Sequence, residues 1–353
     1  MPDRRTFLKA IAYASASGLV ACQLPASVAQ PARREIYIDG RRVKVVDIHA
    51  HCGIQAVEQI VNGTPLATNV SDNRILGPHR LEWLDARGID IQVLSVNQYW
   101  WYAADPLLAR RITRVQDEGL AEWCEKYPDR FVALSTVSLQ HPELAAEQLE
   151  HAVLNLGLRG ASIGGHVNGT VPSSDRFDPF WAKAEELGVP VFMHPNNASF
   201  LVNEGGFEGR GDLGNIIGNP LETTVFLSRL IFDGTLDRFP GLRVCAAHGG
   251  GFLPSYNGRT DVACDVRENA ECANQKRPRA YLKTQILADS MVFTDEGLRH
   301  LVAEMGANQV VYGTDIPFNW PDTLDLILNA DYLSNAEKEA ILGGNLMRLL
   351  RIS

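Results

Sequence analysis

The stretch VVDIHAH, residues 45–51, places two histidines directly behind a run of β-branched apolar residues. Side chains alternate between the two faces of a strand, so His49 and His51 are expected to point the same way at the carboxyl end of a buried strand. Two neutral imidazoles side by side supply half the ligands of a metal site. The alternative is two histidines with unrelated hydrogen-bond partners, and the rest of the chain has to distinguish the two.

Seven further apolar runs follow, and amphipathic stretches separate most of the runs. Residues 106–127 and 142–157 carry apolar residues at three- and four-residue spacing, which is typical of helices packed on one side. Alternation of strand and helix eight times predicts an α/β fold, a (β/α)8 TIM barrel. The rival is a doubly wound open sheet, which needs a glycine-rich phosphate loop that this sequence lacks. The eight runs cover residues 41–51, 89–96, 131–137, 158–165, 189–195, 242–250, 282–289 and 309–317.

The segment EIYIDG, residues 35–40, precedes the first run. Its Asp39-Gly40 pair favours a tight turn between two antiparallel strands. We therefore expect a short N-terminal β-hairpin in front of the barrel.

Chemically active side chains stand at the ends of the predicted strands. His49 and His51 end the first, His194 the fifth, His248 the sixth and Asp315 the eighth. Active sites of such barrels lie at the carboxyl ends of the strands, so these five side chains should meet. Three imidazoles and one carboxylate suit a divalent ion such as Zn²⁺. The sequence therefore predicts a metal site.

The bulk composition limits the classes of function. The chain has 353 residues, 45% hydrophobic and 21% charged, with a formal net charge of −9. This composition is ordinary for a globular protein with a large core. The length fits one large α/β barrel or two medium domains. The acidic balance, without a basic stripe, argues against nucleic acid as a partner.

The first 29 residues have a different character. DRRTFLKA, residues 3–10, contains adjacent arginines, Arg4 and Arg5, and a weakly apolar stretch follows to about Cys22. This stretch is too short and too mild for a permanent membrane span and resembles a twin-arginine export signal. We expect residues 1–29 to be the signal, residues 34–353 to be one barrel domain, and the protein to be periplasmic. The alternative is an amphipathic N-terminal helix.

Two processing routes remain open. Cleavage after SVA, residues 27–29, would release the chain, whereas LVAC, residues 19–22, resembles a lipoprotein site with a lipid anchor on Cys22. Three other cysteines, Cys52, Cys124 and Cys245, look like small core residues. Cys264 and Cys272 share one polar segment and could form a disulfide in an oxidising compartment.

The histidine motifs carry a family resemblance. HxH after the first strand, MHP at 193–195, AHGGG at 247–251 and GTD at 313–315 resemble the amidohydrolase superfamily. Within it, HGGGFLPSYNGR (248–259), RLEWLDARGIDIQVLSV (80–96) and GTDIPF (313–318) are similar to the aminocarboxymuconate-semialdehyde decarboxylase-like family. The resemblance covers roughly residues 44–350.

The resemblance implies a role for each residue of the site. His49, His51, His194 and Asp315 would bind one divalent ion, expected to be zinc. His248 would be a general acid or base beside the ion, and Asp315 would also accept a proton. The fourth strand lacks the lysine or glutamate of binuclear members, which implies a single ion. The ion can lower the pKa of a coordinated water to near ~7.

Substrate-binding residues are less clearly marked. In the decarboxylases an arginine at the position of Arg259 binds a substrate carboxylate, sometimes across a subunit interface, which implies a possible homodimer. The alternative is a solvated helix arginine. Arg74 or Arg80 is the candidate for a second carboxylate-binding arginine. Asp289, at the end of the seventh strand, is expected to orient a neighbour.

Three more side chains are candidates for substrate contact. His166, just after the fourth strand, would touch substrate or cap the backbone of its loop. Trp100 and Trp101, after the second strand, would wall a pocket for a planar ring or form an oligomer contact.

The favoured function is nonoxidative decarboxylation of an aromatic or unsaturated carboxylic acid. The first alternative is metal-dependent hydrolysis of a lactone or another cyclic ester or amide, because both reactions need a Lewis acid and a proton shuttle. A minor alternative is a non-catalytic periplasmic binding protein, which would be expected to have lost a ligand or His248. All five residues are present.

Overall fold

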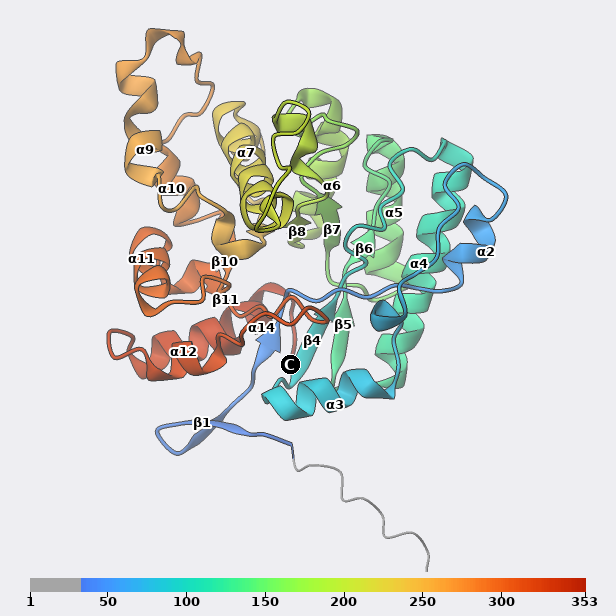
Figure 1. Cartoon of the computed structure of the whole chain (residues 1–353), viewed down its shortest axis with the longest axis horizontal. Helices are drawn as coiled ribbons and strands as arrows, with labels where there is room; N and C mark the ends of the chain where they lie inside the picture. The colour runs from blue at the N-terminus through green and yellow to red at the C-terminus, as the bar shows by residue number, and fades with distance from the viewer. Residues whose placement is uncertain (1–32) are drawn as a thin grey trace, which may run out of the picture. The chain divides into compact units, whose positions relative to one another are not determined.

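Eight parallel strands form the centre of the computed structural model, which describes residues 33–353 (Figure 1). The predicted export signal and Cys22 lie outside the described residues. Pairing runs in the order β3-β4-β5 and then β6-β7-β8-β9-β10-β11, and only Leu134 separates β5 from β6, so these two are one strand. The strands are β3 (Val46–Asp47), β4 (Ile91–Leu94), β5 (Phe131–Ala133), β6 (Ser135–Thr136), β7 (Ala161–Gly164), β8 (Val191–His194), β9 (Val244–Ala246), β10 (Ile286–Asp289) and β11 (Val310–Val311).

The ring of strands closes between β11 and β3. The Ile48 amide donates to the Tyr312 carbonyl over 3.1 Å, and the Asp315 amide donates to the His49 carbonyl over 2.7 Å. A parallel bridge between Ala50 and Ile316 extends this seam. The predicted (β/α)8 barrel is therefore confirmed, and its closure brings the ends of the first and last strands side by side.

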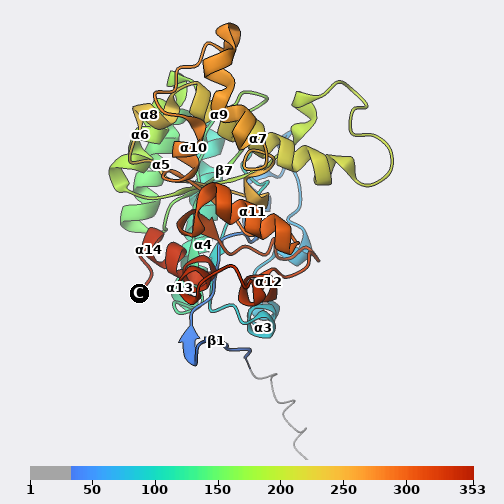
Figure 2. The ribbon, with the colours of Figure 1, turned by 90° about the vertical axis from the view of Figure 1, so that its left-hand side faces the viewer.

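Helices surround the barrel (Figures 1 and 2). Every residue of β4, β7, β8 and β10 is buried, as expected for parallel strands covered by helices. The two helices predicted from apolar spacing are α4 and α5. The helices are α2 (Val57–Val61), α3 (Pro78–Arg87), α4 (Pro106–Lys126), α5 (Pro142–Asn155), α6 (Asp178–Leu187), α7 (Asn219–Phe232), α8 (Thr235–Arg238), α9 (Asn257–Val266), α10 (Pro278–Leu282), α11 (Asp295–Met305), α12 (Leu324–Asn329), α13 (Asn335–Glu339) and α14 (Asn345–Leu349).

The predicted N-terminal hairpin is confirmed. β1 (Ile36–Ile38) pairs antiparallel with β2 (Arg41–Val43). Asp39 and Gly40 both have positive φ, 50° and 71°, as a two-residue hairpin turn of the primed type requires.

Asp90 fastens this hairpin to the barrel. Its carboxylate accepts the buried Val45 amide over 2.7 Å and Arg42 Nη2 over 2.6 Å, and it also contacts Arg33. One buried acid therefore joins the hairpin to the start of the first barrel strand.

The disulfide that the sequence left open is present. Cys264, on α9, is bonded to Cys272, whereas Cys52 and Cys245 are buried free thiols and Cys124 is half-buried. Among residues 33–353 we find no helix with the length and apolar character needed to cross a membrane.

Replacing Asp90 with alanine should lower the free energy of unfolding by about 1–3 kcal/mol, because the buried Val45 amide loses its acceptor. Urea denaturation measures this loss. The matched control is Asp325→Ala, since Asp325 also pairs with an arginine but its side chain is 63% exposed; it should change stability by less than about 0.5 kcal/mol. Equal losses in the two variants would contradict the anchoring role.

Candidate metal centre

The five predicted side chains meet at the carboxyl ends of the strands. One ligand atom from each of His49, His194, His248 and Asp315 lies within 4.8 Å of the others. His51 joins them, with its Nε2 2.8 Å from Asp315 Oδ1, while His49 Nε2 is 3.1 Å from the same oxygen. Segments more than 260 residues apart in the sequence thus converge on one point, because the barrel closes there.

The donor atoms at this point fit a divalent cation. His49 Nε2, both ring nitrogens of His51 and Asp315 Oδ1 are buried without a hydrogen-bond partner in the described part of the chain. Unpartnered buried polar atoms are rare in folded proteins. Here His49 Nε2 and His51 Nε2 lie 3.1 and 2.8 Å from Asp315 Oδ1, and imidazole nitrogens and carboxylate oxygens are among the ligands that bind zinc in proteins.

The two carboxylate oxygens of Asp315 have different histidine neighbours. His49 and His51 approach Oδ1, whereas His248 Nε2 is 3.9 Å from Oδ2. The side chain of His248 is 17% exposed, and those of His49 and His51 are at most 1% exposed. His248 therefore stands on the open side of the carboxylate, where a small molecule can reach it.

Asp289, at the end of β10, orients two of the histidines. Its Oδ2 is 2.6 Å from His49 Nδ1 and accepts the His248 amide over 3.0 Å, while Oδ1 accepts the Gly249 and Met291 amides. This contact places the Nδ1 proton of His49 on the Asp289 side and leaves Nε2 for the centre. Burial opposes ionisation of Asp289, but its contact with His49 lowers its pKa.

Asp47 was missed as a site residue although it stands inside VVDIHAH. Its Oδ1 accepts the amides of His49 and Thr314, and its Oδ2 accepts Thr314 Oγ1 over 2.7 Å and Gln92 Nε2 over 2.8 Å. The signal available in the sequence was an acidic residue inside an apolar strand. The Asp47 carboxylate joins the first strand to the last by these hydrogen bonds.

Arg80 is buried and supports the centre, so it is not the predicted carboxylate-binding arginine. Its Nη2 donates to the His51 carbonyl. Arg74 lies nearer the mouth, between the rings of Tyr99 and Phe318, where it donates to Gln98 Oε1.

The electrostatics of the centre favour a cation. Burial lowers the pKa of His51 to about 4, and burial with the neighbouring histidines holds the pKa of His194 well below its usual value. Both therefore offer neutral imidazoles at pH 7. Burial would also lower the pKa of His49, but Asp315 and Asp289 outweigh it and raise that pKa to about 10. The two carboxylates thus stabilise positive charge at this point.

A cavity of about 400 Å³ opens above the centre. Apart from the residues of the centre, four amide side chains, one carboxylate and two aromatic rings line it, and among the described residues no lysine or arginine does. Most of these residues stand on loops, whereas Asn215 lies in the helical turn Gly214–Gly218 and Asn219 begins α7. Besides residues of the centre, the lining consists of Gln98, Asp212, Asn215, Asn219, Phe318, Asn319 and Trp320.

The four predicted substrate-binding residues do not line this cavity. Trp100 is buried behind His194 and donates to the Ser162 carbonyl. Trp101 packs against Tyr99.

His166 and Arg259 lie away from the cavity as well. His166 accepts the Gly169 amide at Nδ1, and its Nε2 is 2.9 Å from the Asn197 carbonyl, which favours the loop-capping alternative. Arg259 is exposed on α9.

Known proteins share this architecture. The amidohydrolase family model matches residues 102–352. A 2-amino-3-carboxymuconate-6-semialdehyde decarboxylase of Dictyostelium discoideum is 32% identical, over 86% of this chain and 84% of the relative. A gamma-resorcylate decarboxylase of Rhizobium is 31% identical, over 77% and 86%. The crystal structure of a dihydroxybenzoic acid decarboxylase from Polaromonas, with bound manganese and 2-nitroresorcinol, is 24% identical over 88% of this chain and 97% of that one, with a TM-score of 0.76.

Substitution of Asp289 by asparagine should weaken metal affinity about 10- to 100-fold, because a neutral amide replaces the charged acceptor that fixes the His49 ring. Competition with a chelating dye measures the affinity. Asp295→Asn is the control, since Asp295 is an exposed residue of α11 that pairs with Arg299. Unchanged affinity in the Asp289 variant would show that the contact does not orient a ligand.

Proposed function

The chain belongs to the amidohydrolase family, and from this membership we propose that it is a metal-dependent decarboxylase of aromatic or unsaturated carboxylic acids. The observation that carries the proposal is the convergence of His49, His51, His194 and Asp315 on one point, with the more exposed His248 beside it. The two curated relatives described above are decarboxylases by name.

In this proposal the three buried histidines and Asp315 hold one divalent ion, with zinc as the proposed metal. Manganese, as in the similar Polaromonas structure, is the alternative. The ion, when bound, supplies the Lewis acidity that holds the substrate carboxylate and an adjacent oxygen. The neutral imidazoles of His51 and His194 suit zinc, whereas the carboxylate of Asp315 is the ligand that suits manganese.

His248 is the proposed proton donor. His248 lines the cavity, and its Nε2 lies 3.9 Å from Asp315 Oδ2, so it stands where it can give a proton to a substrate in the cavity. Protonation forms a C–H bond at the carbon that bears the carboxylate. The bond from that carbon to the carboxyl carbon then breaks, its electron pair stays with the carbon skeleton, and CO₂ leaves.

The cavity favours an aromatic acid with one carboxylate and hydroxyl substituents. Its amides can donate to and accept from hydroxyl groups, and the rings of Phe318 and Trp320 can pack on a planar substrate. A second carboxylate would find no cation in the lining and would meet Asp212. Arg259 could provide that cation only if a homodimer brought the Arg259 of one subunit to the cavity of the other. We propose that the enzyme accepts a dicarboxylate only in such a homodimer.

The test is an assay of the purified protein on 2,6-dihydroxybenzoate and on a panel of lactones. We expect CO₂ release that a chelator abolishes and Zn²⁺ restores. Opening of a lactone without CO₂ release from any acid would replace decarboxylation by the hydrolytic alternative.

His248→Asn should lower kcat for decarboxylation about 10²- to 10⁴-fold, as loss of a general acid does. Metal content, measured by mass spectrometry, should stay at that of the unchanged protein. Both His194 and His248 lie close enough to Asp315 to be metal ligands. The His194→Asn variant is therefore the matched comparison, and it should lose the metal because His194 is a proposed ligand. Loss of metal from the His248 variant would make it a ligand instead.

We also propose export of the folded, metal-loaded enzyme by the twin-arginine route. Replacing both Arg4 and Arg5 with lysine should then retain activity inside the cell, as cell fractionation measures. The same change at Arg33 and Arg34, outside the proposed signal, is the control. Unchanged periplasmic activity in the first variant would contradict this route, and activity in the membrane fraction that Cys22→Ala releases would favour the lipid anchor.

A further inference from the structure

A basin of about 610 Å³ lies at the opposite mouth of the barrel from the metal centre. Arg243 directly precedes β9, whereas His248 follows that strand, and Lys283 precedes β10, whereas Asp289 ends it. Arg348 on α14 and Arg351 just after it complete the lining on the side of the C-terminus. Four cationic side chains therefore surround one concave surface.

These four charges are not neutralised by the protein. No carboxylate lines the basin, and none of the four cations forms an ion pair within residues 33–353. The chain as a whole is acidic, with a formal net charge of −9, so carboxylates are not scarce. Like charges held close together repel each other, and this repulsion is relieved when an anion enters the basin.

Two of the arginines are held in place by neutral acceptors. The side chain of Asn345, which is 4% exposed, donates to the carbonyls of residues 307 and 310 and accepts Arg348 Nη2 at Oδ1 over 2.6 Å. Arg351 Nη2 donates to the carbonyls of residues 187 and 188, over 3.1 Å each. These contacts orient the guanidinium groups without reducing their charge, so the basin is organised before a ligand arrives.

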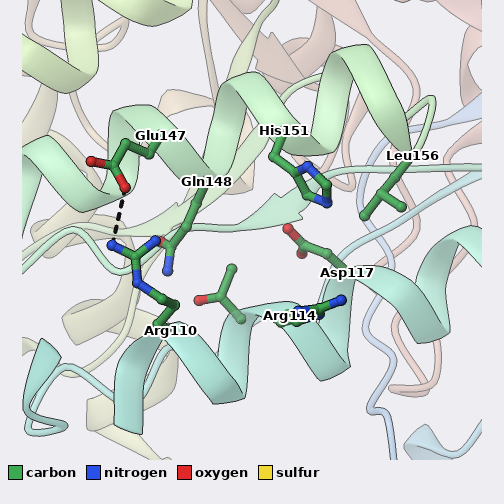
Figure 3. A pocket seen from close by; sticks show the side chains of 8 residues that line it. Arg110, Arg114, Asp117, Glu147, Gln148, His151 and Leu156 are labelled. Atoms are coloured by element: carbon green, nitrogen blue, oxygen red, sulfur yellow. Dashed lines mark hydrogen bonds and ion pairs between the residues drawn. The ribbon is translucent and has the colours of Figure 1, made fainter. Parts of the chain in front are cut away.

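The groove between α4 and α5 shows the contrasting case (Figure 3). There Arg110 pairs with Glu147 over 3.0 Å, Arg114 pairs with Glu118 over 2.8 Å, and the buried Asp117 lines the same groove. This groove also exposes two arginines, but carboxylates balance their charge. It therefore provides a matched control for the basin.

We propose that the basin binds a compact small molecule that carries two or more phosphate or carboxylate groups. Arg243, Lys283, Arg348 and Arg351 supply the charge, and the guanidinium forks match the oxygens of such anions. A concave site of this volume suits a small molecule rather than a flat macromolecular surface. The barrel separates this site from the metal centre, so occupation of one leaves the other open.

The test uses pyrophosphate as the probe and the full-length holoenzyme. Calorimetric titration should give saturable binding, and saturating pyrophosphate should raise Tm by about 2–4 °C above NaCl of equal ionic strength. The double variant R243Q/R348Q should bind at least about tenfold more weakly, as loss of two charge-assisted contacts implies, and lose the rise in Tm. R110Q/R114Q should keep both.

All these variants retain the metal centre, so any chelation of the metal by pyrophosphate is common to them. Circular dichroism and kcat with the preferred acid verify that R243Q/R348Q is folded, since neither residue lies near the centre. Full binding by R243Q/R348Q, equal weakening in R110Q/R114Q, or an equal rise in Tm with NaCl would each overturn the proposal.

Discussion

The closure of the barrel between its first and last strands is the constraint on which the rest of the structure depends. Asp47 binds the His49 amide on one side of the seam and the amide and hydroxyl of Thr314 on the other. Burial raises the pKa of Asp47 to about 6, although these hydrogen bonds act in the opposite direction and lower it. The fold accepts a buried acid there because four donors satisfy it, and the result is a fixed distance between the two histidines that follow β3 and Asp315.

The metal centre is assembled by groups that hold its ligands from behind. Asp289 holds His49 and the turn that begins at His248, Arg80 holds the His51 carbonyl, and Glu222 on α7 accepts two amides of the loop that follows His194. Each of the three histidine ligands is thus supported by a buried polar contact at its ring or at the backbone beside it. Contacts of this kind orient the ligands, and they affect the metal affinity of a site in addition to the identity of its ligands.

Much of this arrangement could be predicted from the sequence. The resemblance to the amidohydrolase superfamily is confirmed, as are the barrel and the hairpin at Asp39-Gly40. The five residues of the centre were predicted to meet because strand ends in a parallel barrel share one mouth, a rule that depends on topology and not on coordinates. Local periodicity, turn residues and short motifs were sufficient for these features.

Features that depend on tertiary contacts were not predicted. Whether His166 caps a loop or meets a substrate depends on where the amide of Gly169 and the carbonyl of Asn197 lie, which spacing cannot show. Trp100 follows a strand end, yet its ring is buried behind His194. The cavity is lined largely by loop residues such as Gln98 and Asn319, and loops carry no periodicity that would mark them.

The most direct test of the central claim is anomalous X-ray diffraction from crystals of the natively purified protein, recorded at the absorption edges of zinc and manganese. The account predicts one anomalous peak, within coordination distance of His49, His51, His194 and Asp315 and beyond coordination distance of His248. A second peak at this mouth, or one centred on other residues, would contradict it. Absence of any peak after incubation with either metal would do so as well.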